Sequence, residues 1–164
     1  MAKNLEANGY NFYGAWATAN DRFLFLSPGQ IAGKWKWIDA YINQIRINSQ
    51  LQLALITLLT SAKSVPYNAD GIALQRAACN DPINEALNFG SIQTGVALSE
   101  QQRALINREA GFDAASMVES RGYCLYIAQA TAQTRGNRQS MPMKLWYTDG
   151  GSVQTINLAS INVQ

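Results

Sequence analysis

The strongest constraint on the fold is an apolar repeat in residues 34–62 that has the spacing of an α-helix. Apolar side chains spaced three or four residues apart share one helix face. The first such row, interrupted only by Ser49, is Ile38, Ile42, Ile45, Leu53, Ile56 and Leu59, and a second row on a different face is Leu51, Leu55 and Leu58. Because two apolar faces need two partners, we expect one long helix whose later turns are buried by other elements. Poor helix formers at residues 47–50 predict a bend in this helix.

Proline and capping residues divide the stretch that follows into further helices. Val65 precedes Pro66 and therefore avoids the helical region, which ends the long helix. Asp81 is a good N-cap because Pro82 then takes the first helical position. The sequence Ser-Glu-Gln-Gln that starts at Ser99 is a capping box. The expected helices span residues 69–79, 81–90, 99–111 and 113–122, and residues 91–98 are expected to be irregular or a short strand.

Two regions on either side of these helices predict β-strands. Residues 10–26 predict a hairpin, and its aromatic side chains fall on both faces, so we expect this sheet to be covered on both. Residues 123–128 and 143–148 predict two more strands, and Asp149-Gly150-Gly151 predicts a hairpin turn. The fold class is therefore α+β, with a small mixed or antiparallel sheet packed with several helices, one of them long and buried. At its length the whole chain, residues 1–164, is expected to be a single domain.

The last thirteen residues, 152–164, are expected to be extended but cannot form one regular strand. Ile156 and Leu158 share one face, whereas Ile161 and Val163 fall on the other. A regular strand changes faces only at a bulge or a break. The pattern therefore leaves two interpretations open, a kink near residues 159–160 or a tail that leaves its own sheet to pair elsewhere.

The composition describes an intracellular globular chain that self-associates. Hydrophobic residues make up 48% and charged residues only 15% of the chain, the opposite of a disordered composition. The net charge of +2 is spread without a basic stripe, so no direct nucleic-acid partner is expected. No signal peptide opens the chain and the most apolar stretch, residues 51–59, is too short to cross a bilayer, so no membrane partner is expected. We expect Cys79 and Cys124 to be buried, reduced thiols.

The sequence offers no set of residues suited to catalysis. It contains no histidine, which removes the commonest general base, the usual nucleophile pairs and most zinc sites. Asp70, Asp81 and Asp113 each stand where a helix start needs an acceptor, and capping explains them. The Gly150-Gly151 pair is better explained by turn geometry than by phosphate binding. We therefore predict no catalytic residue, no cofactor site and no metal site, and the chain is not expected to be an enzyme.

A monomeric binding module is the alternative that the residues leave open. Lys34-Trp35-Lys36-Trp37 alternates charge with indole rings, and such a platform can stack on sugars or on single-stranded bases. Arg135 and Arg138 form a second, locally positive loop. A helix entry with one tryptophan buried and the lysine stems lying along it is the favoured explanation of the first segment, because only two lysines support the platform.

Several stretches of the chain resemble the contractile tail sheath proteins of phages and prophages. The most specific is Leu-Trp-Tyr-Thr-Asp-Gly-Gly-Ser-Val-Gln at 145–154 with Ile-Asn-Leu-Ala-Ser at 156–160. The others are residues 8–20, 23–29, 50–55, 63–67, 81–84 and 87–90, which together follow the family in order along nearly the whole chain. Members of this family are much longer, so the resemblance implies the carboxy-terminal core of a sheath protein, without its amino-terminal part.

The resemblance also implies a function, partners and a set of interface residues. Sheath subunits polymerise around a tail tube and contract to drive DNA delivery, and extended arms of neighbouring subunits complete a small sheet by β-augmentation. On this sequence the arm is residues 152–164, with Val153, Ile156, Leu158, Ile161 and Val163 as interface residues. The implied partners are other sheath subunits, the tail tube protein, the baseplate and the tail terminator. The implied location is the virion, assembled in the cytoplasm of the host bacterium, and no cofactor is implied.

Overall fold

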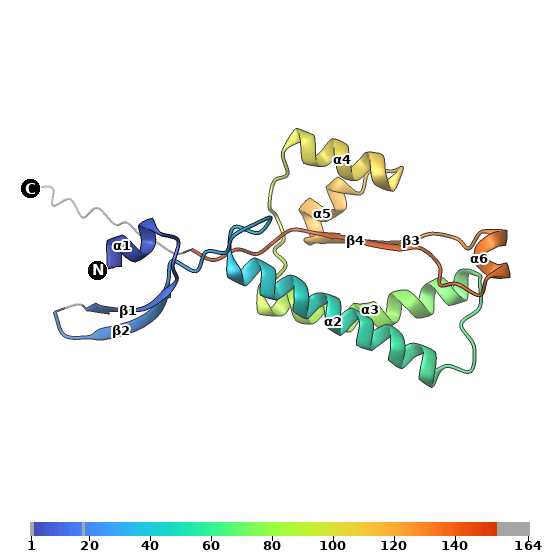
Figure 1. Ribbon diagram of the computed structural model, residues 1–164. Coiled ribbons are helices and arrows are strands. Elements are labelled where there is room, and N and C mark those ends of the chain that lie inside the picture. The colour runs from blue at the N-terminus through green and yellow to red at the C-terminus, as the bar shows by residue number, and fades with distance from the viewer. Residues whose placement is uncertain (1, 18, 154–164) are drawn as a thin grey trace, which may run out of the picture.

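The structure, a computed structural model, describes residues 2–17 and 19–153 of the chain (Figure 1). The elements in chain order are α1 (Ala2–Ala7), β1 (Phe12–Ala17), β2 (Arg22–Ser27), α2 (Ile38–Ser61), α3 (Ala69–Phe89), α4 (Glu100–Ala110), α5 (Ala115–Arg121), β3 (Tyr123–Ile127), α6 (Ala132–Gly136) and β4 (Met143–Tyr147). The described strands form two separate antiparallel hairpins, β1–β2 and β3–β4. The α+β class is confirmed, with two hairpins in place of one small sheet.

The body of the molecule has three layers, with the β3–β4 hairpin in the middle (Figure 1). Helices α2 and α3 form one outer layer, and α4 and α5 cover the opposite face of the hairpin. The strands pair in register, with Cys124 opposite Trp146 and Leu125 opposite Leu145. Since neighbouring side chains of a strand point to opposite faces, each face of this hairpin has its own core.

The larger core lies between the hairpin and the α2–α3 layer. Its buried residues are Ile47, Cys79, Ile83, Ala86 and Ile92, and the strands add Tyr123, Leu125, Leu145 and Tyr147. The smaller core on the other face holds Ala114, Val118 and Cys124, with Trp146 packed against them. Both cysteines are free and buried, as expected. The sequence predicted that the β1–β2 hairpin is covered on both faces. In the structure it is the β3–β4 hairpin that is covered in this way.

Helix α2 differs from the prediction in its start, its straightness and its burial. It begins at Ile38, after the N-cap Trp37, and is helical without interruption through residues 47–50. Ile47 is the one fully buried residue that the helix contributes to the described core. The row with Leu51 and Leu55 packs inward, whereas the row with Leu53 is exposed. In the described part of the chain one layer covers this helix, so the prediction of a long buried helix was wrong for the face that carries Leu53, Ile56 and Leu59.

Helix α3 is one continuous helix where two short ones were expected. Its N-cap is Asn68, whose side chain accepts a hydrogen bond from the Gly71 amide, and Pro82 lies inside it rather than at a helix start. Proline removes one backbone hydrogen bond from a helix interior. Pro82 and its neighbour Ile83 are both buried. Ile83 belongs to the larger core, whereas Pro82 lines the groove between α2 and α3. Asp81 therefore caps no helix.

The ends of α4 and α5 follow the sequence signals closely. Ser99 and Gln102 form the reciprocal capping box, and Gly111 ends α4 in the left-handed conformation. The Asp113 carboxylate accepts hydrogen bonds from the backbone and the hydroxyl group of Ser116 at the start of α5. These predicted caps are confirmed. They could be predicted from the sequence because each depends on residues within one turn of the chain.

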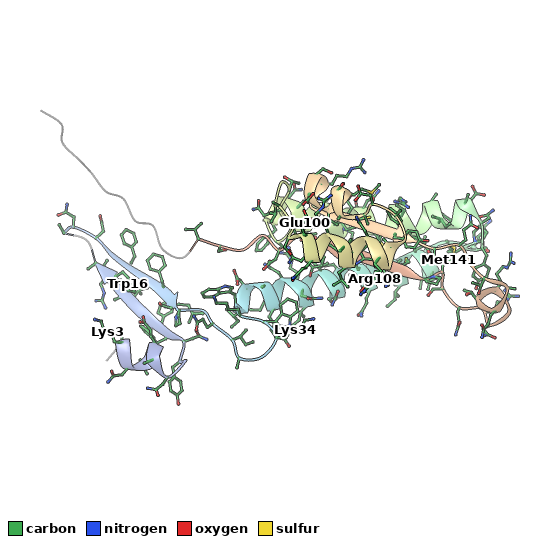
Figure 2. The ribbon with its side chains drawn as sticks, turned by 90° about the horizontal axis from the view of Figure 1, so that it is seen from above. Lys3, Trp16, Lys34, Glu100, Arg108 and Met141 are labelled. Carbon is green, nitrogen blue, oxygen red and sulfur yellow. The ribbon has the colours of Figure 1, made fainter. Side chains whose placement is uncertain are left out.

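The β1–β2 hairpin stands away from the body and is not covered on either face in the described part of the chain (Figures 1 and 2). Its strands pair from Phe12 opposite Ser27 to Ala17 opposite Arg22. Helix α1 contacts β1, and the side chains of both strands nevertheless stay mostly exposed. The expected coverage is thus not provided by residues 2–17 and 19–153.

Candidate functional site

The predicted interface residues lie almost entirely at the end of the chain that the structure does not describe. Val153 is described and leaves 83% of its surface exposed. The other four, Ile156, Leu158, Ile161 and Val163, lie outside the described residues. What the structure does describe is the point at which this segment leaves the body.

That departure point is held by backbone contacts to the loop after α3. Asp149 forms an isolated antiparallel bridge with Ile92, and the Gly150 amide donates a hydrogen bond to the Ser91 carbonyl at 3.0 Å. Gly150 also packs directly on the backbone of Gly90. The predicted hairpin turn at 149–151 is therefore a tight crossing against another segment, and the glycine is needed for the close approach. The chain beyond it starts from a defined position.

A groove of about 420 Å³ opens beside this departure point, and we call it the root groove. The first turns of α2 and the end of α3 form its walls with Ile38, Ile42 and Phe89, and Gly151 and Ser152 form its rim. Ile42 and Phe89 are both more than half exposed. The outgoing chain thus leaves the body next to uncovered apolar surface.

The β1–β2 hairpin presents apolar side chains on both faces. The cross-strand pairs place Trp16, Phe23 and Phe25 on one face, and Tyr13, Leu24 and Leu26 on the other. All six are at least half exposed. A two-stranded hairpin with two apolar faces is marginally stable alone, so this element needs further strands or a packed layer from outside the described chain.

A second exposed apolar surface runs along α2, and we call it the outer ridge. It consists of Ile42, Ile45, Leu53, Ile56 and Leu59, each more than half exposed. These residues are the first apolar row of the sequence, on the side of α2 that faces away from the core. From Ile47 to Ser61 the helix carries no charged residue at all, so this half of the ridge has no charged flank on its own helix.

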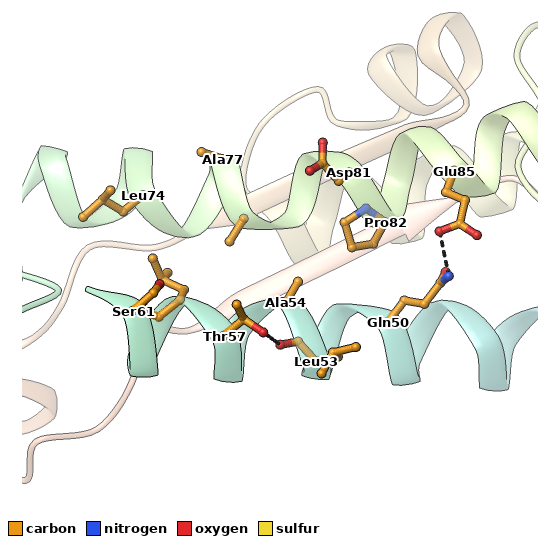
Figure 3. Close-up of a pocket in the computed structure, with 12 residues that line it drawn as sticks. Gln50, Leu53, Ala54, Thr57, Ser61, Leu74, Ala77, Asp81, Pro82 and Glu85 are labelled. Atoms are coloured by element: carbon orange, nitrogen blue, oxygen red, sulfur yellow. Dashed lines mark hydrogen bonds between the residues drawn. The ribbon is translucent and has the colours of Figure 1, made fainter. Parts of the chain in front are cut away.

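Beside the outer ridge lies a groove of about 560 Å³ between α2 and α3, the α2–α3 groove (Figure 3). Small side chains at Ala54, Ala77 and Ala78 keep its floor low, and Leu53 and Leu74 stand at its sides. Leu53 belongs to both the outer ridge and this groove. The two features therefore form one continuous apolar surface.

Two carboxylates line the α2–α3 groove, Asp81 and Glu85, and Glu85 is neutralised within the chain. Glu85 accepts a hydrogen bond from Gln50 at 2.7 Å (Figure 3). It also accepts a hydrogen bond from Arg46, with which it forms an ion pair. The hydrogen bond from Gln50 and then that from Arg46 lower the pKa of the Glu85 carboxyl group. The Arg46 guanidinium also lies 4.5 Å from the centre of the Phe89 ring. A charged ligand is therefore poorly matched to the Glu85 end of the groove.

The residues of the alternative binding module are not brought together. Lys34 and Lys36 lie over the Trp35 and Trp37 rings at 5.2 and 5.4 Å, and Trp35 packs near Tyr41. Both tryptophans are half-buried at the entry to α2. Helix α6, which contains Arg135, lies at the opposite end of the body (Figure 1). One small ligand cannot contact both groups.

The titratable groups of the described residues serve the fold. Burial raises the pKa of the Cys79 and Cys124 thiols. Within residues 2–17 and 19–153 no three acidic, cysteine or histidine side chains gather as a metal site would require. No helix in that part of the chain is both long and apolar enough to traverse a lipid bilayer.

The sequence argument missed the outer ridge as an exposed surface, although it contained the signal. Two apolar rows on one helix were taken to mean two covered faces, but exposed rows look identical in sequence. The absence of charge between residues 47 and 61 was the additional signal that sets this row apart from an ordinary solvated helix face.

Comparison with known proteins identifies the family. Residues 38–163 match the family model described as "E217 tail sheath protein gp31-like, C-terminal domain". No curated protein matches the chain. The match begins at the first residue of α2 and excludes the β1–β2 hairpin. Because it spans most of the 164 residues, the chain belongs to the E217 gp31-like phage tail sheath proteins, of which it contains the C-terminal domain.

Proposed function

We propose that this protein is the carboxy-terminal part of a sheath subunit that surrounds a tail tube and contracts to drive DNA delivery. As a tail sheath protein it is a structural component of the virion that polymerises with other sheath subunits. The tube, the baseplate and the tail terminator are its further partners, and assembly takes place in the host cytoplasm. New contacts between subunits supply the free energy of contraction, in place of nucleotide hydrolysis.

The arm, residues 152–164, joins neighbouring subunits in this proposal. Val153, Ile156, Leu158, Ile161 and Val163 are its interface residues, and its backbone adds a strand to a sheet of another subunit. Each such backbone hydrogen bond contributes about 1 kcal/mol net, so half a dozen hold two subunits together while they move. The observation that carries this proposal is the departure point: Gly150 is tied to Ser91 and Gly90, and the chain then leaves with Val153 almost fully exposed.

The β1–β2 hairpin meets the amino-terminal part of the longer sheath protein in this proposal. Two observations support this assignment. Both faces of the hairpin are apolar and uncovered, and the hairpin precedes the residues that match the C-terminal domain model. The prediction that residues 1–164 form one domain stays a prediction, since the hairpin is attached to the body through residues 28–37.

The arm is tested by truncation of the longer sheath protein. Removal of residues 152–164 is expected to leave the thermal unfolding midpoint of the domain unchanged, because the described core lies before residue 152. The same truncation is expected to abolish tube formation, as seen by electron microscopy. Tubes of normal length from the truncated protein would contradict the proposed role of the arm.

Backbone pairing is tested separately with proline. Asn157→Pro and Leu158→Pro each remove one backbone N–H, on opposite edges of an extended strand. At least one of them is expected to block tube formation, whereas the matched control Asn157→Ala is expected to assemble. Normal assembly of both proline variants would show that the arm does not act through its backbone.

A further inference from the structure

We propose that the outer ridge of α2, together with the adjoining α2–α3 groove, is a contact surface for a second copy of this chain. The proposal deepens the proposed function, on which it rests in one respect: the neighbour is another sheath subunit. It adds a surface that is distinct from the arm and from the β1–β2 hairpin. The surface consists of Ile42, Ile45, Leu53, Ile56 and Leu59 with the groove wall residue Leu74.

The first argument is that this surface is built as the interior of a contact. Ile56 and Leu59 leave 59% and 68% of their surfaces exposed, yet their helix carries no charge after Arg46. Soluble proteins rarely leave a row of large apolar side chains uncovered along a helix. From Ile42 to Leu59 the ridge extends for about 26 Å. That length suits packing by a whole element of a partner, rather than by one inserted side chain.

The second argument identifies the partner as a second copy. The ridge begins in the root groove, where Ile42 faces the departing residues Gly151 and Ser152. In the proposed function residues 152–164 bind a neighbouring subunit, and their first residue, Ser152, lies beside the first turns of α2. Because the ridge continues from there, the same neighbour is placed to cover it.

The third argument concerns charge. The ion pair between Arg46 and Glu85 at this surface lies within the chain, and Gln50 also donates a hydrogen bond to Glu85. The other charged residue that lines the groove, Asp81, is acidic. A nucleic acid would need uncompensated basic residues here, and the ridge has none. A partner with its own apolar, uncharged surface is the better match, and the chain carries such surfaces itself. Closed two-fold pairing would stop growth, so the ridge contacts a different face of the next copy.

The test attaches a benzophenone-maleimide photocrosslinker at Ile56→Cys in the 164-residue chain. Cys79 and Cys124 are buried, and a sample of the unmodified chain measures their residual labelling. The matched control is Leu105→Cys on α4, which is 47% exposed but lies outside the surface. Tagged and untagged copies are mixed and illuminated, and intermolecular dimers are counted and mapped by mass spectrometry. The expected result is a several-fold higher dimer yield at position 56 than at position 105.

Equal dimer yields at the two positions, or none at position 56, would overturn the proposal. The measurement is repeated with Phe23→Asp, which removes association through the hairpin, and the yield at position 56 is expected to persist. Ile56→Glu gives a second readout by sedimentation velocity: it is expected to weaken concentration-dependent association without lowering the thermal midpoint, since the side chain is exposed. If these ridge measurements give the contrary results while the arm truncation still abolishes tube formation, the ridge is not a subunit contact and the proposed function stands.

Discussion

Gly150 lies against the backbone of Gly90 so closely that a Cβ atom on residue 150 would stand 1.8 Å from the Gly90 carbonyl oxygen. The Gly150 amide at the same time donates a hydrogen bond to Ser91. Two segments sixty residues apart in the chain are thus joined where the arm begins. Only a residue without a side chain can pass here.

Gly150→Ala is accordingly expected to lower the free energy of unfolding by about 1–3 kcal/mol, because the added methyl group cannot fit beside a carbonyl oxygen. Urea unfolding followed by circular dichroism measures the change. Gly136→Ala is the control, since a Cβ there meets no atom within 4 Å, and it is expected to change stability by less than about 0.5 kcal/mol. A similar loss in both variants would contradict the close crossing.

Ile47→Ala and Ile56→Ala form a matched pair on one helix that tests its one-sided burial. Ile47 is 1% exposed and Ile56 is 59% exposed. The first variant is expected to lose about 2–5 kcal/mol of unfolding free energy, because it leaves a cavity in the larger core. The second is expected to lose less than about 1 kcal/mol in the monomer. Equal losses at low protein concentration would mean that α2 is buried on both sides.

Glu119 makes part of the stability depend on pH. Its carboxylate accepts a hydrogen bond from the Leu98 amide at 2.9 Å and one from Arg103, and these contacts lower its pKa in the folded chain. The ionised carboxylate therefore stabilises the folded chain at pH values above the unfolded pKa of about 4.3. This stabilisation is lost as the pH falls through the lower pKa of the folded chain. Glu119→Gln is therefore expected to be less stable than the wild type at pH 7, and the two should converge toward pH 3. Urea titrations at several pH values measure this difference, and a constant gap would contradict it.

Ser99→Ala removes the capping box of α4. The Ser99 hydroxyl group accepts a hydrogen bond from the backbone amide of Gln102 at 3.3 Å. The backbone amide of Ser99 donates one to the side-chain oxygen of Gln102 at 2.9 Å. Loss of the N-cap is expected to cost about 1 kcal/mol of unfolding free energy. Ser49→Ala, in the exposed middle of α2, is the control and is expected to be neutral or slightly stabilising, because alanine is the better helix former. An unchanged stability of Ser99→Ala would mean that the capping bonds do not contribute.

Local signals in the sequence determined the ends of α4 and α5, the strands and the class of the fold. The capping box at Ser99, the left-handed Gly111 and the two strands of the β3–β4 hairpin were predicted correctly, because each depends on neighbours in the chain. The same locality explains the error at Pro82. A proline after Asp81 is a strong start signal, but α3 continues through Pro82, and the burial of Pro82 and Ile83 is a tertiary effect that this local signal does not contain.

The sequence by itself also determined that α2 carries two apolar rows and that the β1–β2 hairpin is apolar on both faces. Only the tertiary structure decided which of these surfaces the chain covers. The Ile47 row packs into the larger core, while the Ile56 row and the hairpin stay exposed. The physical reason is that periodicity records which side chains share a face, whereas burial depends on elements far away in the chain, or in another molecule, that pack against it.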